Sequence, residues 1–74
     1  MPMIQISIPA GSLSAEKKAE MIRKVTDAAV EAEGIPGVRA HTWVHITEVP
    51  DGGWGMGGTA VTLAMMQGAL AAGQ

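Results

Sequence analysis

Two short segments of alternating polarity, separated by one helical segment, limit the folds that this chain can adopt. Residues 3–8 read MIQISI, and residues 40–49 read AHTWVHITEV. Alternation with a period of two and many β-branched residues are typical of β-strands. Because a helix-length segment joins the two, we expect parallel strands in a right-handed βαβ unit.

The joining segment, Ala15–Glu33, carries signals for both ends of a helix. Ser14 is suited to be its N-cap, and Glu16 places a carboxylate in the first turn, where the helix dipole favours it. Gly34 suits the position that follows a helix, and Pro36 prevents its continuation. Apolar residues recur on one face at helical spacing; they are Met21, Ile22, Val25, Ala28, Ala29 and Ala32.

The alternation also assigns the two faces of the predicted sheet. The face covered by the helix should carry Ile4, Ile6, Ile8, Val44 and Ile46. The opposite face is semi-polar and carries Met3, Gln5, Ser7, Trp43, His45 and Thr47. Since two strands alone make a poor sheet, we expect a partner chain to extend it.

The composition also predicts self-association. With 74 residues the chain forms one domain, residues 1–74, and it has no cysteine for a disulfide. Apolar residues make up 47% of the chain and charged residues only 16%, which is much apolar surface for a small monomer. A net charge of −2 gives no basic footprint for nucleic acid. Without an apolar run of membrane length or a signal peptide, we expect a cytoplasmic oligomer that binds neither membranes nor nucleic acid.

The last third of the chain is rich in turn residues. Pro50-Asp51-Gly52-Gly53 should close the second strand, and residues 52–58 contain too many glycines for regular structure. From Thr62 onward, apolar spacing indicates a short helix with Thr62 as its cap. We therefore expect a short C-terminal hairpin or helix after the βαβ unit.

Few side chains in the sequence suggest chemistry. Trp43 and Trp54 are the only aromatic residues, and each suits either packing or the wall of a pocket. His41 and His45 are about 13 Å apart along a strand, so they cannot share one metal ion. The glycine-rich segment lacks the lysine of a phosphate-binding loop. We expect neither a metal site nor a cofactor.

Pro2 allows two interpretations. A proline cannot donate a ladder hydrogen bond, so it suits the first residue of a strand. If Met1 is removed, however, Pro2 becomes a free secondary amine, which can act as a base or a nucleophile.

Several of these segments together resemble the 4-oxalocrotonate tautomerase family. They are the initial Met-Pro, the strand MIQISI, the helix EKKAEMIRKVTDAA and the segment WVHITEVPDGGWGMGG. The resemblance covers residues 2 to about 58. It implies an α/β (α+β) subunit consisting of a single βαβ unit. Two subunits would form a four-stranded sheet, and a trimer of such dimers would form a hexamer.

The resemblance also implies an activity. Members of the family convert a small 2-hydroxy-dienoate or enol acid to a 2-oxo acid, and their amino-terminal proline is the general base. The matching residue is Pro2, whose amine must be neutral to accept a proton. Burial in an apolar pocket would lower its pKa, because burial disfavours the charged form.

Two positions depart from the family pattern. The family's archetype has an arginine after the glycine that ends the first strand, where this chain has Ser12. A second arginine lies in the second strand, where this chain has Trp43, whereas the aromatic residue of the loop is matched by Trp54. Because these arginines bind the substrate's carboxylates, a mono-acid is the expected substrate. Arg39, His45, Ser12 and the Trp43 N–H are the candidate replacements.

The expected function is therefore an isomerase that catalyses keto–enol tautomerisation. One alternative is hydration or dehalogenation of an unsaturated acid, with Pro2 acting as an acid. Another is a non-catalytic hexameric subunit, if Met1 is retained and the Pro2 nitrogen is an amide.

Overall fold

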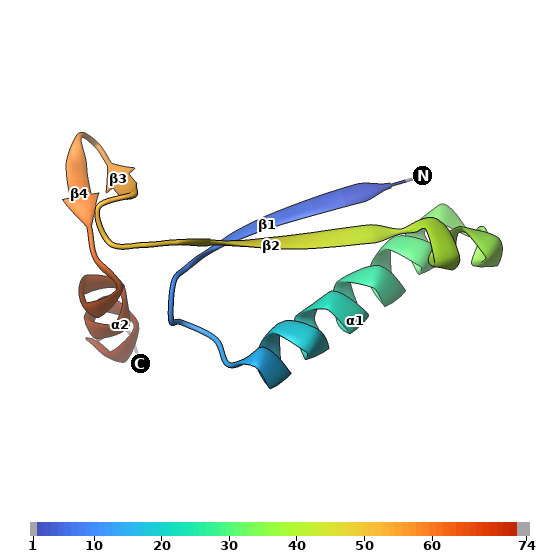
Figure 1. Ribbon diagram of the computed structural model, residues 1–74, viewed down its shortest axis with the longest axis horizontal. Coiled ribbons are helices and arrows are strands. Elements are labelled where there is room, and N and C mark those ends of the chain that lie inside the picture. The colour runs from blue at the N-terminus through green and yellow to red at the C-terminus, as the bar shows by residue number, and fades with distance from the viewer. Residues whose placement is uncertain (1, 73–74) are drawn as a thin grey trace. The chain divides into compact units, whose positions relative to one another are not determined.

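A computed structural model describes residues 2–72 of the chain and divides it into two compact units. The first unit contains the chain up to Ile6 together with Leu13–Thr47, and the second contains Ser7–Ser12 and the chain from Glu48 onward. The elements follow one another in the order β1 (Met3–Pro9), α1 (Ala15–Glu33), η1 (Pro36–His41), β2 (Trp43–Val49), β3 (Trp54–Met56), β4 (Thr59–Val61) and α2 (Leu63–Ala72) (Figure 1). That the chain forms a single domain stays a prediction.

β1 and β2 form a two-stranded parallel sheet, as the sequence predicts. The Trp43 N–H donates to the Pro2 carbonyl at 3.1 Å, where both strands begin. The Ala10 N–H donates to the Val49 carbonyl at 2.9 Å, where both strands end. The two strands therefore begin at the same end of the sheet and run in the same direction (Figure 1). The predicted βαβ unit is therefore confirmed.

Burial along the two strands follows the predicted alternation. In β1 the isoleucines are half-buried or buried, and Ile8 is only 8% exposed. In β2, Val44 and Ile46 are half-buried. The intervening side chains are exposed, with 66% of Met3 and 65% of Trp43 open to solvent. One face of the sheet is thus covered, and the other has no cover within the described chain.

α1 has the predicted bounds, and its caps explain them. The Ser14 Oγ accepts from the Lys17 N–H at 3.2 Å, which satisfies one of the free donors of the first turn. Gly34 has a φ of +70° and donates its N–H to the Val30 carbonyl, as expected of a left-handed glycine after a helix.

β2 begins later than the alternating pattern predicts. Residues 40 and 41 belong instead to η1, a 3₁₀ helix that starts at Pro36. The Thr42 N–H donates to the Arg39 carbonyl, and the Thr42 Oγ1 donates to the Val38 carbonyl at 2.8 Å. These local bonds compete with strand pairing, so the strand starts only at Trp43.

The prediction that residues 52–58 lack regular structure is wrong. β3 and β4 pair antiparallel, with Trp54 opposite Val61 and Met56 opposite Thr59. The connecting residues Gly57 and Gly58 both have positive φ, at 60° and 85°. A two-residue hairpin turn of this kind needs positive φ at both positions, so the glycines form the turn instead of disrupting the strands.

The predicted C-terminal helix is present in addition to the hairpin. The Thr62 Oγ1 accepts from the Met65 N–H at 3.2 Å, which confirms Thr62 as the cap. Asp51 also caps α2, because its Oδ1 accepts from the Leu63 N–H at 2.8 Å. None of the helices within residues 2–72 has the length and apolarity that crossing a bilayer requires.

The tight turn before β3 generates a prediction about stability. A Cβ on Gly53 would lie 2.6 Å from Val49 Cγ1 and 3.1 Å from the Pro50 carbonyl oxygen. We expect Gly53→Ala to lower the free energy of unfolding by about 1–3 kcal/mol, as overpacking does. Urea unfolding at one fixed protein concentration measures this change.

Gly37→Ala is the matched control, because a Cβ there meets no atom within 4 Å. It should change the free energy of unfolding by less than about 0.5 kcal/mol. Equal urea midpoints for the two variants would contradict the predicted clash.

Candidate active site

Pro2 immediately precedes β1 and is half-buried. Its carbonyl accepts a hydrogen bond from the Trp43 N–H at 3.1 Å. Its nitrogen has no backbone N–H to donate to the sheet. Met1 lies outside the described residues, so its predicted removal stays a prediction. The site begins with a proline whose backbone is fixed by the first residue of β2.

Trp43, whose backbone N–H binds this proline, has a large exposed ring. It is the first residue of β2, and 65% of its surface is exposed. His45 follows two residues later, and because side chains alternate along a strand, it lies on the same face and is also exposed. The parallel pairing therefore brings three predicted site residues, Pro2, Trp43 and His45, into one part of the first unit.

Arg39 is held by a carboxylate on α1. Its Nη1 donates a short hydrogen bond to Asp27 Oδ1. Arg23 Nη1 lies 4.0 Å from the other oxygen of the same carboxylate, Asp27 Oδ2. All three side chains are about half exposed. Since such exposed pairs contribute about 0–1 kcal/mol, Arg39 can exchange Asp27 for another anion at little cost.

The chain path connects Arg39 to the proline. The Arg39 carbonyl accepts from the Thr42 N–H, and the next residue, Trp43, donates to Pro2. The sequence alone does not indicate the role of Asp27 as the partner of Arg39. The sequence predicts that Arg23 and Asp27 are neighbours, because residues four apart lie on the same side of a helix. It does not predict the contact between Asp27 and Arg39, which lie in different elements.

Ser12 and Trp54 belong to the second unit. The side-chain O–H of Ser12 and N–H of Trp54 both donate to backbone carbonyls. The Ser12 Oγ donates to the Pro9 carbonyl at 2.7 Å. The Trp54 Nε1 donates to the Val49 carbonyl at 3.3 Å, and its ring is half-buried. Both side chains are therefore fixed, and the Ser12 hydroxyl has only its acceptor lone pairs left for a ligand.

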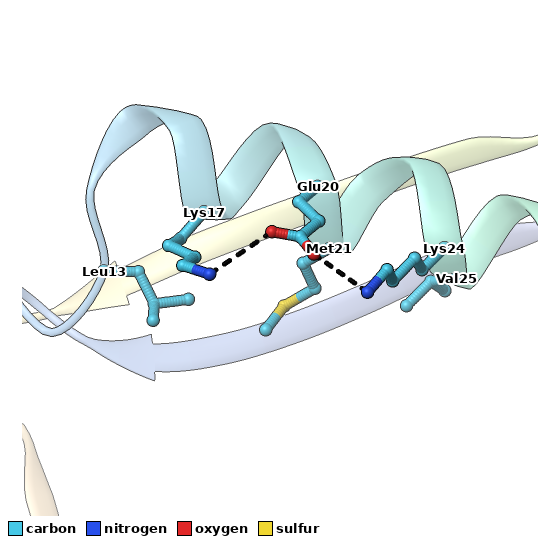
Figure 2. A pocket seen from close by; sticks show the side chains of 6 residues that line it. All are labelled: Leu13, Lys17, Glu20, Met21, Lys24 and Val25. Carbon is cyan, nitrogen blue, oxygen red and sulfur yellow. Dashed lines mark hydrogen bonds and ion pairs between the residues drawn. The ribbon is translucent and has the colours of Figure 1, made fainter.

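A groove of about 310 Å³ lies along α1. Figure 2 shows Lys17 and Lys24 reaching the Glu20 carboxylate from either side, with Nζ–Oε distances of 3.4 and 2.8 Å. The hydrogen bond from Lys24, and to a smaller extent the one from Lys17, lowers the pKa of Glu20 below its usual range. The groove is lined by Leu13, Lys17, Glu20, Met21, Lys24 and Val25. None of the predicted site residues is among them.

Within the part of the chain that the structure describes, no three His, Cys, Asp or Glu side chains gather as metal ligands would.

A βαβ unit that follows an initial proline is what the resemblance to 4-oxalocrotonate tautomerases implies, and comparison with known proteins identifies the family. The family model described as tautomerase enzyme matches residues 2–64. Two proteins called 2-hydroxymuconate tautomerase, from Comamonas testosteroni and Pseudomonas putida, are each 42% identical over 60 residues. The match covers 81% of this chain and 90% of each relative. The chain belongs to the tautomerase family and is an isomerase of that class, which confirms the resemblance to 4-oxalocrotonate tautomerases.

Proposed function

We propose that this protein is a keto–enol tautomerase that uses the amine of Pro2 as its general base. It acts on a small 2-hydroxy-dienoate or enol acid and gives the 2-oxo acid. The observation that carries the proposal is the hydrogen bond from the Trp43 N–H to the Pro2 carbonyl, in a chain of the tautomerase family. That bond fixes the backbone of the proline against the first residue of β2.

The reaction requires only proton transfer. With Met1 removed, the neutral Pro2 nitrogen takes the proton of the enol hydroxyl, and the resulting enolate is protonated at carbon by the ammonium. Burial beneath the substrate and the tryptophan rings disfavours the ammonium and lowers the amine's pKa toward the working pH. A base tuned in this way contributes roughly 10²–10⁴-fold to the rate.

The proposed substrate carries one carboxylate and an apolar end. Ser12 and Trp43 stand where the family's archetype has arginines. The chain therefore lacks the two cations that would bind the carboxylates of a di-acid. Arg39 supplies the cation for the one carboxylate by exchanging Asp27 for it, which its exposed ion pair supports. Trp43 and Trp54 line the apolar part, the former from a neighbouring copy, and His45 and Ser12 make the remaining polar contacts.

We further propose that the active form is a homo-hexamer, built from dimers with four-stranded sheets. The support is the sheet itself: it has two strands, and one of its faces leaves Met3 and Trp43 about two-thirds exposed. Two-stranded sheets are marginal alone, and large exposed apolar side chains on one face mark a contact surface. The cytoplasmic location expected from the sequence stays a prediction.

The role of Pro2 is tested by Pro2→Ala. The variant keeps a free amine after Met1 removal, but a primary one of different geometry, so kcat should fall by at least about tenfold, within the range that a general base contributes. Stability should change little, because Pro2 donates no ladder hydrogen bond. Wild-type activity should rise with pH through the amine's pKa, since only the neutral form accepts a proton.

Intact mass serves as the control for this experiment, because it shows whether Met1 is present. Active wild-type protein that retains Met1, or Pro2→Ala with unchanged kcat, would overturn the proposed base. Folded protein that retains Met1 and has no activity would instead indicate the non-catalytic subunit.

The substrate class is tested by comparing an aryl enol mono-acid with 2-hydroxymuconate. We expect kcat/KM for the mono-acid to equal or exceed that for the di-acid. Arg39→Gln should raise KM for the mono-acid about tenfold, because a hydrogen bond to a charged group contributes about 1.5–3 kcal/mol. Arg23→Gln is the matched control, since Arg23 approaches the same Asp27 carboxylate, and its KM should stay within about twofold. A hundredfold preference for the di-acid would contradict the proposal.

The assembly is tested by sedimentation at low micromolar concentration. We expect a compact species of six chains. A charge placed on the uncovered sheet face by Met3→Glu should break it into smaller species, whereas Glu31→Gln on the exposed side of α1 should not. A folded monomer of 7.6 kDa in the wild type would refute the proposed oligomer.

A further inference from the structure

The C-terminal helix α2 differs in chemistry from the rest of the chain. Its sequence, LAMMQGALAA, contains no charged residue. The family model ends at residue 64, so all but the first two residues of α2 lie beyond the matched region. The tautomerase chemistry proposed above therefore gives α2 no role.

α2 exposes apolar side chains on more than one side. Met65 is 52% exposed and Leu70 is 68% exposed. They are five residues apart, and with about 3.6 residues per turn they point in different directions. A helix that is apolar all round is normally buried, so α2 needs a cover that the described chain does not supply.

The N-terminus of α2 is nevertheless well capped. The Thr62 hydroxyl and the Asp51 carboxylate both accept from backbone N–H groups of its first turn. Its last turn contains no basic residue to offset the partial negative charge of its free carbonyls. α2 is therefore a preformed apolar helix whose last carbonyls favour a cation.

The groove on α1 combines apolar side chains with positive charge, which suits the apolar end of α2 and its carbonyls. Its floor is formed by the apolar side chains of Leu13, Met21 and Val25 (Figure 2). Its rim carries two ammonium groups and one carboxylate, a net charge of about +1, and each ammonium has donors beyond its bond to Glu20. An apolar helix end rich in free carbonyls suits this floor and this rim.

We propose that the α1 groove of one copy of this chain receives the C-terminal half of α2 from a second copy. Leu70 packs on the floor, and the last carbonyls of α2 face Lys17 and Lys24. Helix and groove are different surfaces of the same chain, so the contact is heterologous and closes when copies are arranged around a rotation axis. The proposal does not depend on the chemistry of Pro2.

Site-specific cross-linking tests this contact, because the natural chain has no cysteine. One chain carries Met21→Cys on the groove floor, and an isotopically heavy chain carries Leu70→Cys. The two are refolded together and treated with a short bismaleimide, and mass spectrometry counts the hybrid product. Each chain has one thiol, so the hybrid arises only from a contact between copies.

The matched control replaces Met21→Cys with Ala19→Cys, which lies two residues away, on the other side of α1, and is exposed. We expect the Met21 pair to give at least tenfold more hybrid than the Ala19 pair. Equal yields would overturn the proposal. If Met21→Cys fails to fold, Val25→Cys provides the same comparison.

Two further measurements separate the alternatives. A single chain carrying both Met21→Cys and Leu70→Cys should cross-link between copies, and a purely intrachain product would overturn the proposal in favour of docking within one chain. Lys17→Gln combined with Lys24→Gln should lower the hybrid yield at least threefold. An unchanged yield would contradict the proposed placement of the helix end.

Discussion

The parallel pairing of β1 with β2 is the constraint on which the rest of this structure depends. It is closed at one end by the Trp43 N–H and the Pro2 carbonyl, and at the other by the Ala10 N–H and the Val49 carbonyl. In Pro2 the ring fixes φ, so the one soft backbone torsion left is ψ. The bond to Trp43 restrains that torsion, and the direction of the Pro2 nitrogen is then set by the pyrrolidine ring. A strand-starting proline and a positioned amine are therefore compatible interpretations of the same residue.

The same pairing explains why so much of the βαβ unit could be predicted from the sequence. Alternation, Ser14 and Gly34 are local signals, and each specifies a structure that the neighbouring residues also favour. The β3–β4 hairpin could not be recognised in this way, because five glycines among seven residues look like a loop by composition. The hairpin depends on glycine at positions 57 and 58, where the turn needs a positive φ. The number of glycines in the segment does not show that two of them occupy these positions.

The candidate site was predictable only in part, for a related reason. The closeness of Pro2 and Trp43 follows from parallel strands, and the shared face of Trp43 and His45 follows from alternation. The partners of the other residues depend on contacts that no spacing encodes. Ser12 donates to Pro9 and Trp54 donates to Val49, so donors that the sequence leaves free are already in use. The pairing of Arg39 with Asp27 joins residues from two different elements.

The distribution of basic residues limits how an anionic substrate can be bound. Of the five Lys and Arg residues, Arg39 alone lies outside α1. Arg39 is therefore the one Lys or Arg residue outside α1, and a second would have to come from the α1 helix of some copy. Asp27 has Arg23 as a second neighbour, so it keeps a cation nearby when Arg39 turns to a substrate carboxylate. A charge-assisted bond to a carboxylate that is shielded from water is stronger than an exposed one. Arg39 can exchange Asp27 for one carboxylate, and no other Lys or Arg outside α1 is available for a second. This is why we propose a mono-acid as the substrate.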